Sequence, residues 1–394
     1  MRSSCALGVC VDEVALNTGR WWDTSVPNDG GVVNDDTQRA FFDKALAAAA
    51  ALPSTLSSVG SPIARCLGRH RLKKRTLVVP NPAAVGPMCG MRVVQQIKPY
   101  RVARVVLTID EHDAVHVLTT NIAALFFDAS WDGENHTVSE TFVIDRDQFS
   151  IAAVSNRHVC FRKGMWSVCD LGTERTASTY GPMRQVLEST FTIVAGRGAE
   201  ERDAAVCLAN LMHMSGHAFA PVIDSDHADE TLWNSAQNLV LVGLPDTNSW
   251  VRRVLAASVA HLQISETSDG NAGKKKTEIR VGACVFDGPG IGVAALLPTG
   301  PRPGRLALLL SATDVDGLRN VMSLATPTIP PMVRQPFSNT LPDVVVVDGR
   351  LRAEGAGGFL LAGYWNNDWS FASDVSYTSY CTTRDAPQNV KQEL

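Results

Sequence analysis

The stretch that decides the fold reads FTIVAGRGAEERDAAVCLANLMHM and covers residues 191–214. Its first five residues are apolar or β-branched, which is typical of a buried strand. From Ala199 onward apolar residues recur at the spacing of one helix face, which predicts a helix from Ala199 to Met214. A strand followed at once by a helix is the unit from which α/β domains are built.

The same alternation continues on both sides of this stretch. Further strands are expected at residues 219–223, 238–243, 279–286, 292–297 and 306–310. Helices are expected from Trp250 to Leu262 and from Asp314, as the capping residue, through Leu324. Because strands that alternate with helices usually run parallel, the sequence predicts a mainly parallel α/β domain over residues 173–326.

A different period marks residues 76–172. Short β-branched runs at residues 104–109, 115–120 and 140–144 are separated by polar clusters that are typical of turns. Several short strands at this spacing predict a small β-sandwich. A linker over residues 53–75, rich in small residues and then in basic ones, precedes it.

The two ends of the chain have their own character. Residues 1–52 form a short segment that ends in an expected helix, with Asp35 and Asp36 as capping residues. Residues 327–394 contain a Pro-rich stretch, a last strand at residues 344–347 and a tail rich in Gly and Trp. We expect this tail to wrap onto the α/β core.

Composition excludes several classes of protein. The chain has 394 residues, with 36 Lys and Arg against 40 Asp and Glu, so its formal net charge is −4. This balance argues against a nucleic-acid partner, which calls for a basic surplus, and no apolar run is long enough to span a membrane. The nine cysteines include no Cys-x-x-Cys pair, which argues against a zinc ribbon. Asp12 and Glu13 end the first apolar stretch early, so the sequence shows no clear signal peptide.

Four segments together resemble a known family. They are residues 180–186 (YGPMRQV), 238–245 (NLVLVGLP), 305–318 (RLALLLSATDVDGL) and 355–370 (GAGGFLLAGYWNNDWS). This sequence is similar to the C-terminal half of large fungal prolyl-oligopeptidase-like (S9-like) proteins. The resemblance implies an α/β-hydrolase C-terminal remnant at residues 1–52, followed by an extra β module and a final α/β module.

The resemblance also implies where a catalytic triad would lie. The segment Gly19-Arg20-Trp21-Trp22-Asp23 matches the family's Gly-His-Trp-Trp/Phe pattern, in which the His is the triad base. Here that position is Arg20, and a guanidinium stays protonated and cannot act as a general base. The sequence also has no Gly-x-Ser-x-Gly elbow to present a nucleophile. We therefore expect a truncated or split protein that has no catalytic residues and is inactive alone.

Three further candidate sites follow from residue types. His213 and His217 lie one helical turn apart, near Asp224, Asp226 and His227, which are zinc-ligand types. No Glu accompanies the pair as in HExxH, and Gly216 is expected to end the helix, so helix-end polar residues are the preferred interpretation and no metal is expected.

The loop Gly196-Arg197-Gly198 lies between a strand and a helix, as a dinucleotide-binding loop does. Its third glycine would fall at Glu201, whose charge opposes a pyrophosphate, so no nucleotide cofactor is expected.

The tail offers Trp365, Asn366, Asp368 and Trp369 as weak ligand-binding candidates, because aromatic rings beside amides stack on sugars or peptides. Packing of the two Trp rings onto the core is the preferred interpretation.

Three functions stay open at this point. The first is a non-catalytic accessory region of a prolyl-oligopeptidase-like serine hydrolase, with that hydrolase's catalytic domain as the expected partner. The second is a serine peptidase or esterase whose triad lies outside the family pattern. The third is a standalone ligand-binding α/β protein.

Overall fold

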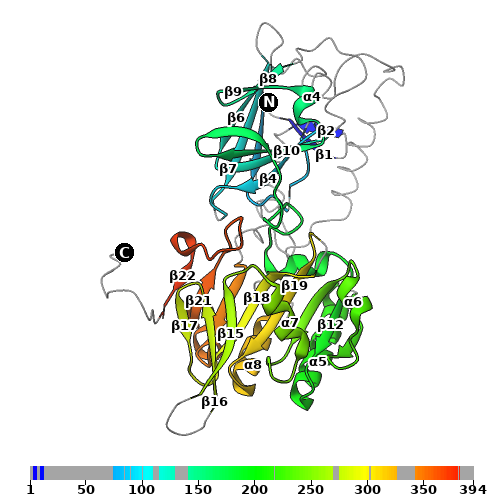
Figure 1. Cartoon of the computed structure of the whole chain (residues 1–394), viewed down its shortest axis with the longest axis vertical. Coiled ribbons are helices and arrows are strands. Elements are labelled where there is room, and N and C mark those ends of the chain that lie inside the picture. Colours follow the sequence, from blue (N-terminus) through cyan, green and yellow to red (C-terminus); the bar gives the residue numbers. More distant parts are fainter. Residues whose placement is uncertain are drawn as a thin grey trace, which may run out of the picture. The chain divides into compact units, whose positions relative to one another are not determined.

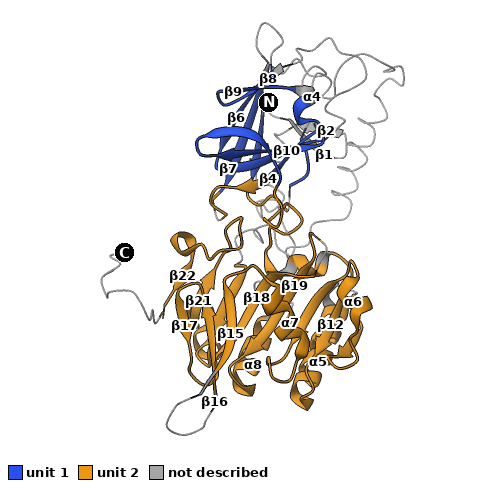
Figure 2. Cartoon of the chain, viewed as in Figure 1, with its two compact units in different colours: residues 1–79, 85–94, 102–170 blue, residues 80–84, 95–101, 171–394 orange. Residues whose placement is uncertain are grey.

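The computed structural model describes residues 3–6, 9–12, 74–83, 85–88, 90–99, 101–109, 115–128, 141–216, 218–268, 275–300, 303–325, 342–379 and 381. The chain is mixed α/β, with more residues in strands than in helices (Figure 1). It divides into two compact units (Figure 2). Unit 1 comprises residues 1–79, 85–94 and 102–170, and unit 2 comprises residues 80–84, 95–101 and 171–394.

Unit 1 is built from β-sheets. A five-stranded sheet has the order β3 (Lys74–Val79), β5 (Ala103–Ile109), β6 (Val115–Thr120), β8 (Thr141–Ile144) and β9 (Asp147–Ser150). A four-stranded sheet has the order β11 (Met165–Cys169), β10 (Arg157–Arg162), β7 (Ile122–Phe127) and β4 (Met91–Gln96). The unit also holds the hairpin of β1 (Ser3–Ala6) and β2 (Val9–Asp12) and the short helix α4 (Ile151–Val154).

Alternation of side chains explains the core of unit 1. In β5, Val105 and Leu107 are fully buried whereas Arg104 is exposed, as a strand with one face on a core requires. Both sheets contribute to the same apolar cluster, which includes Leu107 from one and Phe127 from the other. Two sheets that share one core match the arrangement expected from the period of two.

Unit 2 is organised by an eight-stranded sheet and its covering helices. The strand order is β13 (Val222–Asp224), β12 (Phe191–Ala195), β14 (Asn238–Val242), β19 (Leu306–Ala312), β18 (Gly292–Pro298), β20 (Val344–Val347), β21 (Phe359–Gly363) and β22 (Tyr377–Thr378). The helices are α5 (Ala199–Gly216), α6 (Glu230–Asn234), α7 (Ser249–Ala257), α8 (Val315–Met322) and α9 (Leu351–Glu354). The 3-10 helices are η3 (Met183–Glu188), η4 (Ser323–Ala325), η6 (Gly355–Gly358) and η7 (Ser373–Val375). A separate three-stranded sheet contains β15 (Leu262–Ser268), β16 (Lys275–Val281) and β17 (Cys284–Phe286).

The large sheet is parallel over only one half. The pairs β13–β12, β12–β14 and β14–β19 are parallel, whereas β19–β18, β18–β20, β20–β21 and β21–β22 are antiparallel. Within residues 173–326, where a mainly parallel domain is expected, β18 is the strand of the large sheet that runs antiparallel, and the further antiparallel strands β20, β21 and β22 lie in residues 327–394. Buried strands such as β18 read as continuous apolar runs in either orientation, so the sequence does not distinguish the two.

Three expected elements end elsewhere than predicted. Helix α7 stops at Ala257, where the backbone N–H of Ser258 donates to the Val254 carbonyl, and Leu262 begins a strand instead. The run 279–286 is split by a turn in which Gly282 has a φ of +56°. The strand at residues 344–347 is followed by β21 and β22, so part of the Gly-rich tail completes the sheet rather than wrapping around it.

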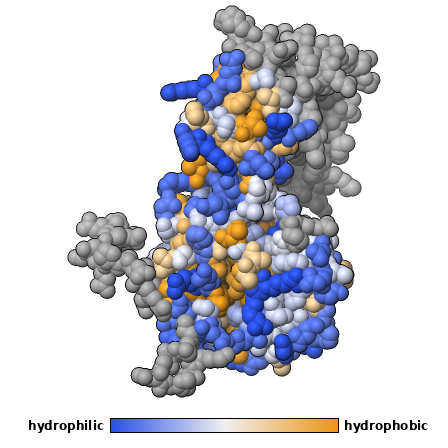
Figure 3. Space-filling view, in the orientation of Figure 1, coloured by the Kyte–Doolittle hydropathy of each residue, from blue (hydrophilic) through white to orange (hydrophobic). Residues whose placement is uncertain are grey.

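The caps of two helices follow from the sequence. Asp314 caps α8, as predicted, and its Oδ1 accepts the backbone N–H of Gly317 at 2.8 Å. Asn248 caps α7 by accepting the N–H of Trp250 at 3.0 Å. None of the helices in the described ranges is long and apolar enough to cross a membrane. On the face drawn in Figure 3, apolar residues form small patches among hydrophilic ones.

Candidate functional site

The carboxyl ends of the parallel strands are the first place to look for a site, because open α/β sheets usually bind ligands there. In unit 2 this edge brings together the loops that follow β12, β14 and β19. The loop after β12 is Gly196-Arg197-Gly198, and the loop after β14 contains Leu244 and Thr247.

A carboxylate of the chain itself lies between these loops. Glu201, in the first turn of α5, is 3% exposed. Its Oε2 accepts the N–H of Gly198 at 3.0 Å, and its Oε1 accepts the N–H of Leu244 at 2.8 Å and the hydroxyl of Thr247. These donors form the kind of nest that binds a phosphate at a helix N-terminus.

The glycines beside Glu201 allow its carboxylate to lie close to the backbone. A Cβ built on Gly196 would collide with the Glu201 carboxylate, and one on Gly243 would lie 2.7 Å from Oε1. Gly243 also has a φ of +135°, which side chains rarely adopt. The glycines that suggest a dinucleotide loop therefore accommodate Glu201, and its carboxylate occupies the position that a phosphate would take.

Of the candidate zinc ligands within the described residues, His227 and Asp224 lie close together, with 3.5 Å between Nδ1 and Oδ2. His213 is exposed on α5, and its ring lies 4.5 Å from that of Phe219, measured between centroids. Asp224 pairs with Arg202, and Asp226 pairs with Arg197 at 3.1 Å. No group of three or more His, Cys, Asp or Glu side chains within the described residues could hold a metal. His217 lies outside those residues, and so does Arg20 at the family's triad position.

The two tail Trp rings lie in the interior of unit 2. Trp365 and Trp369 are 0% and 1% exposed, and the indole N–H of Trp365 donates to the Leu296 carbonyl at 2.8 Å. Trp369 donates to the Thr173 carbonyl at 3.1 Å. Between them, Asn366 donates to the Ser370 hydroxyl at 3.0 Å.

Asp368 joins the same turn, since it accepts the Ser370 N–H at 3.0 Å. The structure thus brings Trp365, Asn366, Asp368 and Trp369 together, but it uses the two rings for packing and the two polar side chains for a turn.

A buried ion pair fixes these rings. The Arg175 guanidinium lies 4.9 Å from the Trp369 ring centre and 4.8 Å from that of Tyr180. Its Nη1 donates to Asp343 Oδ2 and to the Trp365 carbonyl, both at 2.8 Å. Burial raises the pKa of Asp343, and the charge of Arg175 opposes this rise. Burial likewise raises the pKa of the Tyr180 hydroxyl, which donates to Asn367 Oδ1 at 3.0 Å.

A cavity of about 370 Å³ is present elsewhere in unit 2. We call it the Glu174 cavity; its wall includes Thr173, Glu174, Val259, Thr299, Arg305 and Trp369. Glu174, Thr299 and Arg305 cannot be recognised as neighbours from the sequence, because they come from two loops far apart in the chain and form no motif. The cavity lies beyond the ends of α7 and β18, to which Ala257 and Pro298 belong.

No protein-family model matches this chain, and no curated protein matches it.

Proposed function

We propose that this chain is a non-catalytic accessory region of a serine hydrolase that resembles the prolyl-oligopeptidase-like proteins, and that it serves in assembly or substrate access. The observation that carries the proposal is the position of Glu201. Its carboxylate fills the nest at the carboxyl edge of β12 and β14, where an α/β protein would bind a substrate or cofactor. Because Glu201 already accepts the N–H groups of Gly198 and Leu244, these donors are not available to a ligand, and this favours a structural role for the sheet edge.

The turns after the parallel strands support the same interpretation. In an α/β-hydrolase the nucleophile stands on a sharp strand-to-helix turn. Here the turn between β12 and α5 contains Gly196, Arg197 and Gly198 and has no Ser. The turn between β19 and α8 contains Thr313, whose hydroxyl donates to the Gly288 carbonyl at 3.0 Å, and Asp314, which caps the helix. Both turns use their polar groups to hold the fold.

Three serine hydroxyls elsewhere in unit 2 also have structural partners. Ser235 and Ser323 donate to backbone carbonyls one turn earlier, at 2.8 and 2.6 Å. Ser376 donates to the Ala372 carbonyl at 2.6 Å. A Ser nucleophile needs a neighbouring base to remove its proton, and these hydroxyls face carbonyls instead. Among the residues that the structure describes, these three serines therefore support a structural role rather than that of an off-pattern nucleophile.

Reaction with a fluorophosphonate probe tests the absence of catalysis. We expect neither the wild type nor Arg20→His to be labelled or to hydrolyse activated esters above background, because restoring a base alone provides no activated Ser. A known serine hydrolase in the same assay is the positive control. Stoichiometric labelling of one Ser in the wild type would overturn the proposal, and labelling of Arg20→His alone would show that a nucleophile is present.

The link to a hydrolase is tested on the transcript. We expect sequence upstream of the Met1 codon to encode, in frame, a domain with a Gly-x-Ser-x-Gly elbow. An in-frame stop codon directly upstream would contradict the accessory-region proposal and favour a standalone protein.

A further inference from the structure

The β10–β11 hairpin of unit 1, residues 157–169, presents apolar side chains to solvent. Phe161, Met165 and Val168 are 37%, 62% and 39% exposed. Met165 lies opposite Arg162 on the neighbouring strand, on the face of the hairpin that points away from the core-facing Trp166. Apolar residues scattered singly over a surface need no explanation, whereas three of them between positions 161 and 168 are a concentration that does.

The same hairpin is basic. It contains Arg157, Arg162 and Lys163, all exposed, and no Asp or Glu. Asp170 follows at the base of the hairpin, at the end away from its turn. Arg146, in the turn between β8 and β9, is exposed as well, and neither Arg146 nor Lys163 forms an ion pair with a residue that the structure describes. The hairpin is therefore a local exception in a chain whose formal net charge is −4.

Trp166 attaches the hairpin to the core and to the neighbouring turn. It is 5% exposed, its backbone N–H donates to Asp147 Oδ2 at 2.8 Å, and its indole N–H donates to Asp145 Oδ2 at 2.9 Å. These bonds place the β8–β9 turn, with Arg146 between the two aspartates, beside β11. Asp145 also accepts the backbone N–H of Thr119 at 2.8 Å. Both carboxylates therefore have partners within unit 1, whereas Arg146 remains exposed to solvent.

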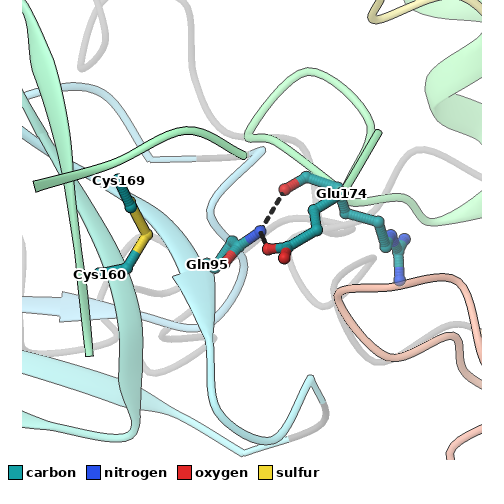
Figure 4. Close-up of a disulfide and its surroundings, with 5 residues drawn as sticks. Gln95, Cys160, Cys169 and Glu174 are labelled. Atoms are coloured by element: carbon teal, nitrogen blue, oxygen red, sulfur yellow. Dashed lines mark hydrogen bonds between the residues drawn. A yellow bond between two sulfur atoms is a disulfide. The ribbon is translucent and has the colours of Figure 1, made fainter. Parts of the chain in front are cut away.

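A disulfide and a tight turn hold the shape of the hairpin. The bond between Cys160 and Cys169 joins its two strands (Figure 4). At the other end, Lys163 and Gly164 have φ values of +54° and +84°, as a two-residue turn between twisted strands requires. A surface whose backbone is fixed before binding loses little conformational entropy on contact.

The size of this surface fits the headgroup region of a membrane better than a protein partner. A stable protein–protein interface takes about 800 Å² and about 20–30 residues from each side, which is more than one hairpin supplies. At a bilayer, a few apolar side chains can enter the boundary between headgroups and acyl chains while Lys and Arg contact anionic headgroups. Such binding at the membrane surface needs no membrane-spanning helix.

We propose that the tip of the β10–β11 hairpin docks unit 1 on a bilayer that contains anionic lipids. Met165 and Phe161 enter the headgroup boundary, and Lys163 and Arg146 contact the anionic groups of the lipids. The docking surface lies in unit 1 and shares no residue with the sheet edge around Glu201, so it goes beyond the accessory role proposed above.

Sedimentation of the full chain with lipid vesicles tests the proposal. We expect saturable binding to phosphatidylcholine vesicles that contain about 30% phosphatidylserine, and binding about tenfold weaker or less to phosphatidylcholine alone. Raising the salt concentration from about 0.05 M to about 0.5 M should weaken binding to the anionic vesicles, because salt screens exposed charges. Absence of binding to the anionic vesicles, or equal binding to both kinds, would overturn the proposal.

Two surface variants assign the binding to the hairpin. Lys163→Asn removes a charge at a position whose positive φ Asn tolerates, and Met165→Ser removes an exposed apolar side chain. The two changes together should weaken binding to the anionic vesicles about tenfold or more. The matched controls Arg352→Gln on α9 and Met214→Ser on α5, which also change exposed residues, should leave binding unchanged.

A third variant, Met165→Trp, keeps the apolar character of the tip and reports on its insertion. With anionic vesicles the additional tryptophan emission, obtained by subtracting that of the wild type, should shift to shorter wavelength. An unshifted emission, or hairpin variants that bind as the wild type does, would contradict docking through the hairpin. Binding of soluble poly-L-glutamate in place of the vesicles would also contradict it, and would assign the basic surface to an acidic protein instead.

Discussion

Arg175 and Asp343 form a buried ion pair in unit 2. The two side chains are 0% and 3% exposed, and the two residues lie 168 positions apart in the chain. Desolvating two charges is costly, so the pair holds only because each charge has further partners. Asp343 also accepts the N–H of Trp365 at 3.1 Å, and Arg175 reaches the Thr179 carbonyl at 3.1 Å. The contact therefore orders the tail and the loop before η3 at once.

Replacing Arg175 by Met should destabilise unit 2 in a pH-dependent way. The loss at neutral pH should be about 3–5 kcal/mol of unfolding free energy, because the buried Asp343 carboxyl group loses its counter-ion. Burial already raises the pKa of Asp343 above its ordinary value of 3.8, and the variant loses the opposing charge of Arg175, so the pKa rises further. The folded variant then holds a proton that the unfolded chain has released, so its stability falls as pH rises from 3.8 through the raised folded-state pKa.

Urea denaturation of wild type and Arg175→Met at about pH 5 and pH 7 checks this sign. The difference between the two proteins should be smaller at the lower pH. Adding Asp343→Asn to Arg175→Met serves as the control, since it removes the titrating group and should recover part of the neutral-pH loss. An equal loss at both pH values would show that the pair acts through packing alone.

Individual strands are predictable from this sequence where apolar residues are continuous. The runs at residues 191–195, 238–242 and 306–310 all lie in strands of the large sheet, because each is buried on both faces. Strand β21 (Phe359–Gly363) was missed as a sheet member because glycines surround it, and glycine disfavours strands in isolation. Its pairing with β20 is a tertiary contact, with Val345 opposite Ala362, that local pattern does not encode.

The candidate site could also be predicted only in part from the local sequence. The glycines at positions 196 and 198 correctly mark a strand-to-helix turn. Their reason for being glycine is visible only once Glu201 is placed between two loops that are distant in sequence. The wall of the Glu174 cavity is likewise formed by segments that are distant in sequence, so no local sequence pattern predicts it.

A disulfide secures the end of the described chain to a small sheet. Cys284 in β17 is bonded to Cys381, at a sequence separation of 97 residues. Cross-linking so long a loop restricts the unfolded chain, which is the usual reason that such a bond stabilises a protein. A second bond joins Cys160 and Cys169 of β10 and β11 (Figure 4). Nine cysteines without a regular spacing gave no way to choose these pairs from the sequence.

Cys381→Ser should lower the unfolding free energy by about 2–5 kcal/mol, the range found when a native disulfide is removed. Cys207→Ser is the matched control, because Cys207 is exposed and unbonded and its replacement should leave the unfolding midpoint unchanged. Urea denaturation of the oxidised proteins gives the comparison. Equal stability of Cys381→Ser and the wild type would mean that the bond does not constrain unit 2.

The two units of the whole molecule are interleaved in sequence. Residues 80–84 and 95–101 belong to unit 2, although the strands on either side of them belong to unit 1. Within unit 2, Asn81 donates to the Gly181 carbonyl at 2.9 Å, and the backbone N–H of Gln96 donates to the Tyr180 hydroxyl at 2.8 Å. The boundary expected at residue 173 is close to Leu171, where the long segment of unit 2 begins, but a single cut there does not release the whole unit.

A protein of residues 171–394 should therefore be less stable than unit 2 in the full chain. Without residues 80–101, the buried Tyr180 hydroxyl and the carbonyls of Arg175 and Gly181 lose their donors or acceptors, and each unsatisfied buried group costs about 1–3 kcal/mol. Amide hydrogen exchange of Val194, Leu241 and Leu309 reports on β12, β14 and β19 in both proteins, and protection should fall in the fragment. Asn81→Ala in the full chain removes one of these bonds and should reproduce part of the loss. Identical protection in fragment and full chain would mean that residues 171–394 fold independently of the two inserted segments.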